Sequence, residues 1–189
     1  MSQGASSERT PSDASRTLEA SAFRRWIVVL LVIAFVLVID RVTKQYVVDH
    51  LHHGESVQPI PALYPYFQIT FTENRGAAFG FLPQSGDMFL IIAILVVAAM
   101  LIFYPRLPEG AWGSRIATGM ICGGALGNAI DRLMYGAVVD FIHYQLPGVV
   151  SNVSNIADHA ILAGVVLLLV ESWRMDVRMK RSEHATETE

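Results

Sequence analysis

Four aspartates lie where a carboxyl group is costly unless it has a function. Asp40 and Asp131 end long apolar stretches, Asp158 begins another, and Asp140 lies in the short segment before it. Ionisable side chains at the edge of a membrane span are rare and are functional candidates by default. Two carboxyl groups that lie close together share a proton, so one can activate water while the other donates a hydrogen bond. The pattern therefore indicates acid–base chemistry at one boundary of a membrane.

Asp131 and Asp158 are the stronger candidates. Asn128 and two glycines lie within two helical turns before Asp131, on adjoining parts of one face, which leaves open space and an orienting amide beside this carboxyl group. The structural alternative for Asp131 is an ion pair with Arg132. The alternative for Asp158 is a helix start with Asn155 as N-cap, where an acidic third residue adds about 0.3–1 kcal/mol. Such a start would also mount a catalytic carboxyl group rigidly.

Asp40 and Asp140 have stronger structural explanations. Asp40 and Lys44 are four residues apart on a predicted helix and most simply form an ion pair along it. Asp140 lies within Val-Val-Asp-Phe-Ile, where it could equally hold a turn in place or take part in catalysis.

Other chemistries have less support. A metal site would need histidines to join Asp140 and Asp158, but none of the established zinc spacings is present. A serine nucleophile with a histidine base is conceivable, but no nucleophile elbow is present. The residues concerned are His143, His159, Ser151 and Ser154. We therefore expect neither a metal nor a cofactor.

Composition places the chain in a membrane. Of its 189 residues 52% are hydrophobic and 16% charged, and the mean hydropathy is +0.40, whereas roughly a quarter of a typical soluble domain is charged. The one cysteine, Cys122, excludes an internal disulfide framework. A net charge of −3 gives no basic face for nucleic acid.

Four apolar stretches must position these aspartates. About 20 helical residues cross a hydrocarbon core of about 30 Å, and backbone in lipid must satisfy its own hydrogen bonds, so each stretch predicts a transmembrane helix. The stretches cover residues 26–39, 88–104, 111–130 and 156–173. Within the third, Gly119, Gly123 and Gly127 form a small-residue stripe typical of helix packing.

Lysines and arginines set the orientation, because they gather on the cytoplasmic side. Ten fall on the side of the two termini and four on the other. The ten are Arg9, Arg16, Arg24, Arg25, Arg106, Arg115, Arg174, Arg178, Lys180 and Arg181, and the four are Arg41, Lys44, Arg75 and Arg132. This count predicts cytoplasmic termini and places all four aspartates at the outer boundary.

The segments outside the spans predict little regular structure apart from one outer loop. Residues 1–22 and 179–189 are polar and indicate a disordered leader and tail. The first span is predicted to be an uncleaved anchor, because Asp40–Lys44 replaces a small-residue cleavage site. In the outer loop, Tyr66–Thr72 alternates apolar and polar residues and 77–82 is apolar again, which predicts a small sheet or hairpin.

Two functions from other classes compete with catalysis. A small transporter or proton-coupled channel would use intramembrane acids as relays, which predicts charges at mid-bilayer depth. A non-catalytic assembly protein would need only the glycine stripe and would tolerate Asp131→Asn.

The chain resembles signal peptidase II, the bacterial lipoprotein signal peptidase family. The resemblance covers about Trp26 to Trp173 and rests on a combination of motifs in order. These are Asp40 with Lys44, Asn74–Phe79, Gly124–Arg132, Val138–Ile142 and Asn155–Asp158.

The resemblance implies a mainly α membrane protein and an activity. It implies an intramembrane aspartic endopeptidase in residues 23–178, with four transmembrane helices and an outer β-cradle at about 55–83. Its substrates would be lipid-modified prolipoproteins, cut before the diacylglyceryl-cysteine by a monomer at the periplasmic face of the bacterial inner membrane. Asp131 and Asp158 fall on the family's catalytic pair. The supporting and substrate-binding positions are Asn74, Gly76, Asn128, Arg132, Asn155, Asp40, Lys44 and Asp140. Ser154 and His159 depart from the family's usual residues.

Helix dipoles predict the roles within that pair. Asp158 lies at a helix N-terminus, where the positive end of the dipole favours a charged carboxylate, and Asp131 lies at a C-terminus. Asp158 is therefore the predicted base and Asp131 the predicted proton donor.

Overall fold

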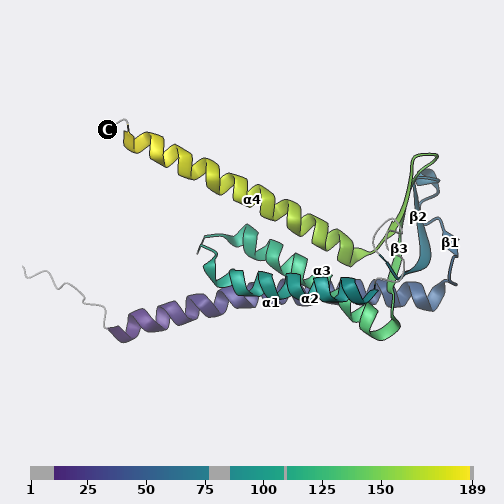
Figure 1. Cartoon of the computed structure of the whole chain (residues 1–189), viewed down its shortest axis with the longest axis horizontal. Coiled ribbons are helices and arrows are strands. Elements are labelled where there is room, and N and C mark those ends of the chain that lie inside the picture. Colours follow the sequence, from purple (N-terminus) through teal and green to yellow (C-terminus); the bar gives the residue numbers. More distant parts are fainter. Residues whose placement is uncertain (1–10, 77–85, 109, 188–189) are drawn as a thin grey trace, which may run out of the picture.

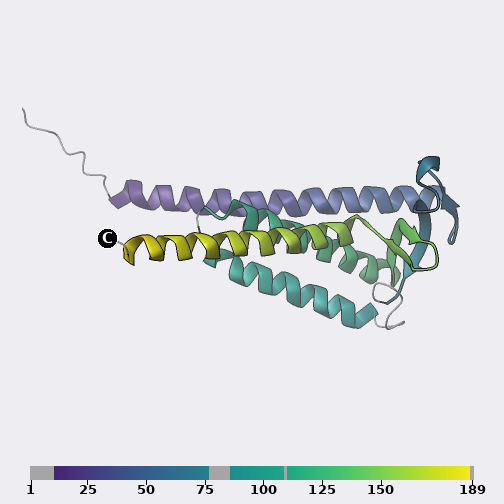
Figure 2. The ribbon, with the colours of Figure 1, turned by 90° about the horizontal axis from the view of Figure 1, so that it is seen from above.

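The computed structural model describes residues 11–76, 86–108 and 110–187, with side chains for 23–76, 87–108 and 110–181. Its long helices are α1 (Pro11–His50), α2 (Gly86–Phe103), α3 (Trp112–Tyr135) and α4 (Ile156–Glu187). They run up and down along one direction, and α1 begins and α4 ends at the end of the bundle away from the strands (Figures 1 and 2). This arrangement agrees with the four predicted helical stretches.

The strands form an antiparallel sheet at the other end of the bundle (Figure 1). Its order is β1 (Ser56–Val57), β2 (Phe67–Asn74), β3 (Val138–Leu146) and β4 (Val150–Ser154). The short helices η1 (Pro61–Leu63) and η3 (Tyr104–Arg106) lie in the connections. The predicted strand at Tyr66–Thr72 is confirmed as part of β2, whereas the predicted partner at 77–82 lies outside the described residues.

Half of the sheet comes from the segment between the third and fourth predicted spans, for which the sequence predicted little regular structure. That prediction was wrong, because β3 and β4 form a hairpin between α3 and α4. Val138–Leu146 is rich in β-branched and aromatic residues, and Gly148, at φ +76°, supplies the turn. The same strand pairs with β2, so it joins the outer loop to the bundle.

The glycine-rich helix α3 packs against the other three helices. A Cβ atom at Gly119 or Gly123 would lie within 3 Å of Val32 or Val36 of α1, and one at Gly124 would meet the backbone of Ala157 in α4. The predicted packing role of the stripe is confirmed. Among the described residues, α1, α2 and α4 are long and apolar enough to cross a membrane. Most residues of α3 are instead buried against the neighbouring elements.

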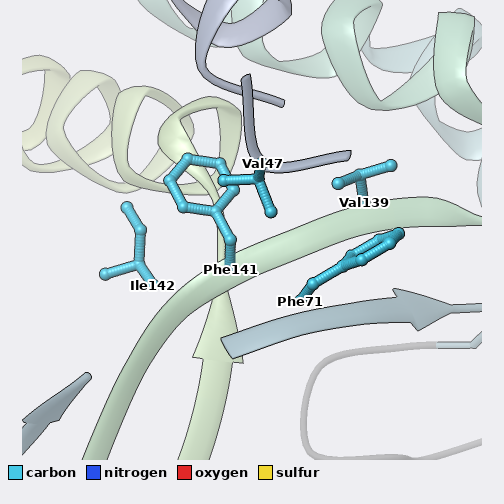
Figure 3. Packing of buried hydrophobic residues seen from close by; sticks show 5 residues of the cluster. All are labelled: Val47, Phe71, Val139, Phe141 and Ile142. Atoms are coloured by element: carbon cyan, nitrogen blue, oxygen red, sulfur yellow. The ribbon is translucent and has the colours of Figure 1, made fainter. Parts of the chain in front are cut away.

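A compact apolar cluster fixes the sheet to the end of α1. Val47 of α1 packs against Phe71 of β2 and against Val139, Phe141 and Ile142 of β3 (Figure 3). All of these side chains are buried. Because β3 also carries Asp140, this cluster sets the position of that carboxyl group relative to the bundle.

The terminal helices are longer than the sequence indicated. Residues 11–22 continue α1 backwards and residues 179–187 continue α4, where we had predicted disorder. Pro11 suits a first helical position, and the alanine, glutamate, lysine and arginine residues of both segments favour helix. The rest of the predicted leader and tail lies outside the described residues.

Candidate active site

A cavity of about 590 Å³ opens where the sheet meets α3 and α4. Two carboxyl groups line it, those of Asp140 and Asp158. Amide and cationic groups line it as well, from Asn74, Asn128 and Arg132, and apolar wall residues include Phe89 of α2 and Leu162 of α4. A concave site with a few convergent polar groups among apolar walls is typical of a catalytic or ligand-binding site.

The strand pairing places Asp140 in the wall of the cavity. Helix α3 ends at Gly136, whose φ of +69° turns the chain directly into β3. Thr72 of β2 is the cross-strand partner of Asp140. Asn74, two residues further along β2, donates a hydrogen bond from Nδ2 to Asp140 Oδ2 at 3.0 Å.

Asp158 lies in the first turn of α4. The predicted cap is confirmed, because the Asp158 backbone N–H donates to Asn155 Oδ1 at 2.9 Å. The Asp158 side chain therefore lies at the positive end of the helix dipole. Asn128 Nδ2 donates to Asp158 Oδ1 at 2.7 Å.

Two asparagine amides connect the carboxyl groups. Asn155 is fully buried and donates from Nδ2 to Asp140 Oδ1 at 2.6 Å and to Asn128 Oδ1 at 3.2 Å. Asn128 in turn donates to Asp158. The Oδ1 atom of each amide already accepts a hydrogen bond. This fixes the orientation of each amide group, with its Nδ2 directed at a carboxyl oxygen. The pair of asparagines thus holds Asp140 and Asp158 in one network.

Burial gives Asp140 a pKa far above that of an ordinary aspartate. Its side chain is 2% exposed, and this burial, with the nearby charge of Asp158, raises the pKa of Asp140 to about 7. The hydrogen bonds from Asn74 and Asn155 and the charge of Lys44 oppose the rise. Asp140 therefore holds a proton at pH values below neutrality.

Behind the cavity lies a buried cluster of charges that contains the other two aspartates. The predicted pair is confirmed, since Lys44 Nζ lies 2.7 Å from Asp40 Oδ2. Lys44 also lies 2.9 Å from Asp131 Oδ2 and donates to Asn128 Oδ1 at 3.1 Å. Asp40 accepts the backbone N–H of Ala157 at 2.9 Å, so it caps α4 from α1.

Asp131 belongs to this charge cluster and does not line the cavity. Arg41 Nη1 lies 2.9 Å from Asp131 Oδ1, and the Val139 backbone N–H donates to Oδ2 at 3.3 Å. The side chain is 1% exposed and has two cations beside it, Arg41 and Lys44. The predicted alternative of a pair with Arg132 does not form, because Arg132 points to the cavity instead.

Arg132 presents a donor with no partner among the described residues. Its Nη1 and Nη2 donate to the backbone oxygens of Asn128 and Gly76 at 3.3 and 3.5 Å, and its guanidinium lies over the ring of Phe89. The buried Nε atom makes no hydrogen bond in the described structure. A carbonyl oxygen that entered the cavity could accept a hydrogen bond from this Nε atom.

Comparison with known proteins settles the family. The family model described as signal peptidase (SPase) II matches residues 32–174. The chain belongs to the signal peptidase II family. The predicted resemblance is thereby confirmed.

Relatives and solved structures agree with this family. A lipoprotein signal peptidase of Halothermothrix orenii is 35% identical over 148 residues, which cover 78% of this chain and 97% of the relative. One of Desulfitobacterium hafniense is 39% identical over 151 residues, covering 80% and 96%. Two solved bacterial membrane enzymes align with TM-scores of 0.70 and 0.66 at 33% and 34% identity. They cover 77% and 75% of this chain and 87% and 90% of their own chains.

The motif residues of this signal peptidase II family member divide between two places. Asn74, Gly76, Asn128, Arg132, Asp140 and Asp158 line the cavity, and Asn155 bridges them from behind. Asp40, Lys44 and Asp131 form the buried charge cluster. Sequence reasoning missed Arg41, which follows Asp40 and so faces Asp131 from the next position on α1.

The alternative catalytic groups lie elsewhere or have other partners. His143 contacts Ser151 Oγ and Thr70 Oγ1, each at 2.9 Å, and these residues do not line the cavity. Ser154 and His159 do line it, and His159 Nδ1 is engaged by the Asn155 backbone oxygen at 2.7 Å. Within the described part of the chain, no group of three or more His, Cys, Asp or Glu side chains could hold a metal ion.

Proposed function

We propose that this chain is an intramembrane aspartic endopeptidase that removes the signal peptide from lipid-modified prolipoproteins, cutting before the diacylglyceryl-cysteine. The observation that carries the proposal is the pairing of Asp140 and Asp158 in one cavity at the end of a membrane-spanning bundle. The substrate class comes from the family and from the named relatives.

We further propose that the catalytic pair is Asp140 and Asp158 rather than Asp131 and Asp158. Asp140 shares the cavity with Asp158 and keeps a proton near neutral pH. Asp131 is not part of the cavity wall and forms ion pairs with Lys44 and Arg41. Arg41 holds one carboxyl oxygen of Asp131 and Lys44 holds the other, so neither oxygen faces a substrate in the cavity.

The environments of the two carboxyl groups assign their roles. Asp158, at a helix N-terminus, is the charged base and takes a proton from water as the water oxygen attacks the scissile carbonyl carbon. Protonated Asp140 donates its proton to the carbonyl oxygen, which gives a neutral tetrahedral diol. When the C–N bond breaks, Asp158 gives its proton to the leaving nitrogen and Asp140 recovers one from the diol. The pair is then ready for a second turnover.

The surrounding groups account for binding. The buried Nε of Arg132 can donate a hydrogen bond to a carbonyl oxygen of the substrate, and Gly76 lies beside it in the wall of the cavity. Phe89 and Leu162 supply apolar walls from the two helices that flank the cavity. Lipid chains of the substrate could therefore remain in the bilayer beside α2 and α4 while the peptide bond reaches the carboxyl groups.

The positive-inside count supports the orientation. We propose four spans with α3 shielded inside, cytoplasmic termini, and a monomer whose active site faces the periplasm in the inner membrane. The channel alternative is disfavoured because the aspartates gather at the sheet end of the bundle rather than along it.

Cleavage of purified substrates tests the proposal. The protein in proteoliposomes, with a metal chelator present throughout, is given one prolipoprotein with and without its diacylglyceryl group. Mass spectrometry should show a cut immediately before the modified cysteine, none in the unmodified protein, and none with Asp158→Asn. Equal cleavage of both substrates, a cut elsewhere, or no cleavage by the wild type would contradict the proposal.

A further inference from the structure

A second cavity, of about 570 Å³, lies behind the sheet and between the strands and the last turns of α1. We call it the rear pocket. Its apolar walls are Val42, Val47 and Leu51 of α1 with Val57 of β1, Ile69 of β2 and Phe141 of β3. It shares no lining residue with the catalytic cavity. Phe141 follows Asp140 in β3, and successive strand residues point to opposite faces, so the two cavities lie on opposite sides of the strand.

The lining of the rear pocket favours an uncharged ligand. Among the described residues that line it there is no Asp, Glu, Lys or Arg. Two of its polar atoms are already engaged: Thr43 Oγ1 donates to the backbone oxygens of Ile39 and Asp40 at 2.8 and 3.0 Å, and His50 Nδ1 contacts the Tyr46 backbone oxygen at 2.8 Å. A water-filled cavity needs polar partners for its waters. These walls suit a hydrocarbon chain instead.

The rear pocket is continuous with the lipid-facing surface of the protein. Large apolar side chains on one face of α1 are about two-thirds exposed, at successive spacings of three or four residues. They are Leu31, Phe35, Val38, Val42 and Tyr46. The last two are also lining residues of the pocket. A fully apolar exposed face on a membrane helix faces lipid, so this stripe leads from the bilayer into the pocket.

The depth of the pocket also matches lipid. Trp26 marks an interfacial position near the beginning of the span. Counting about 20 helical residues from there across a core of about 30 Å reaches the far boundary near residue 45. Residues 42–51 therefore lie where the acyl chains meet the headgroups.

We propose that the rear pocket binds one acyl chain of a membrane phospholipid. The chain enters along the α1 stripe at Val42 and Tyr46 and lies against Phe141 and Ile69, while the headgroup stays at the interface. The volume falls in the range of roughly 300–1,000 Å³ that is usual for ligand pockets. Figure 3 shows Val47 and Phe141, two of its walls, meeting at the end of α1.

Photolabelling tests this site. The wild type is reconstituted with phosphatidylcholine that carries a diazirine in one acyl chain, irradiated, and mapped by peptide mass spectrometry. Val57→Trp places an indole ring in the wall of the pocket, and Leu63→Trp places one on the exposed outer segment outside it. If Val57→Trp does not accumulate, Val42→Trp blocks the pocket from α1.

We expect wild-type adducts on the lining residues within 42–51 and on Val57, Pro59, Ile69 and Phe141. They should fall about tenfold in the blocked variant, because a ring that fills the cavity leaves no room for a chain, and persist in Leu63→Trp. Adducts on Leu31 and Phe35 should be the same in all proteins. The proposal would be overturned if the blocked variant gave as many pocket adducts as the wild type. It would also be overturned if the wild-type pocket were labelled no more than the exposed Ile91 and Leu95 of α2.

Discussion

The proton on Asp140 should set the alkaline limit of activity. Burial and Asp158 raise the pKa of Asp140 to about 7, and the proposed mechanism needs this group protonated. The rate should therefore be lost as pH rises through about 7. With that pKa, about one tenth of the enzyme keeps the proton at pH 8, so kcat/KM should fall about tenfold for each further pH unit.

Removing one hydrogen bond should move this limit in a known direction. Asn74 donates to Asp140 Oδ2 at 3.0 Å, and this bond lowers the pKa of Asp140. Asn74→Leu keeps the volume but removes the donor, so the pKa rises further and the alkaline limb shifts to higher pH. The readout is the position of the limb in kcat/KM, which a general loss of binding would not move.

The same proton links stability to pH. The carboxyl group has its ordinary pKa of 3.8 when unfolded and about 7 when folded, so the folded state binds the proton more tightly. The stabilising contribution is fully present below about pH 4 and is lost as pH rises through 7. Three pKa units correspond to about 4 kcal/mol.

Two measurements between pH 4 and 9 check the pH limit of cleavage and the pH dependence of stability. They are the cleavage rate and the free energy of unfolding, each for the wild type, Asn74→Leu and Asp140→Asn. Asp140→Asn should lose this pH dependence of stability. A flat wild-type rate between pH 6 and 9, or a limb in Asn74→Leu at the same or lower pH, would refute the reasoning.

Three further changes test the supports of the site. Lys44→Met leaves buried Asp131 with only the partly exposed Arg41, and should cost about 3–5 kcal/mol of unfolding free energy in detergent; a loss below about 1 kcal/mol would count against the charge cluster. Gly124→Ala forces a methyl group against the Ala157 backbone and should cost about 1–3 kcal/mol in the same assay, with unchanged stability as the contrary result. Ser151→Ala should leave lipoprotein cleavage unchanged, because Ser151 lies outside the catalytic cavity; loss of cleavage would revive a serine mechanism.

Much of the architecture could be predicted because membrane constraints are strong. The apolar stretches and the distribution of basic residues placed four aspartates at one boundary, and the structure joins them through hydrogen bonds and ion pairs. The N-cap at Asn155 and the pair of Asp40 with Lys44 follow from local spacing alone. The glycine contacts of α3 follow from spacing as well.

The choice of partner for each carboxyl group could not be predicted locally. Lys44 pairs along its own helix and also reaches Asp131 on α3, a contact that depends on how the helices pack. Asp140 lies in the wall of the cavity because β3 pairs with β2. The sequence of 138–146 alone did not predict this pairing. Burial, rather than sequence neighbours, then raises the pKa of Asp140.

Cleavage by three matched variants tests the assignment of the catalytic pair most directly. Lipid-modified prolipoprotein is given to Asp140→Asn, Asp158→Asn and Asp131→Asn, and unfolding is measured on the same samples. The account predicts that Asp140→Asn and Asp158→Asn are folded but inert. Asp131→Asn should be destabilised by about 3 kcal/mol and still cleave at temperatures where it stays folded. Substantial cleavage by Asp140→Asn, or an Asp131→Asn variant as stable as the wild type and inert, would contradict it.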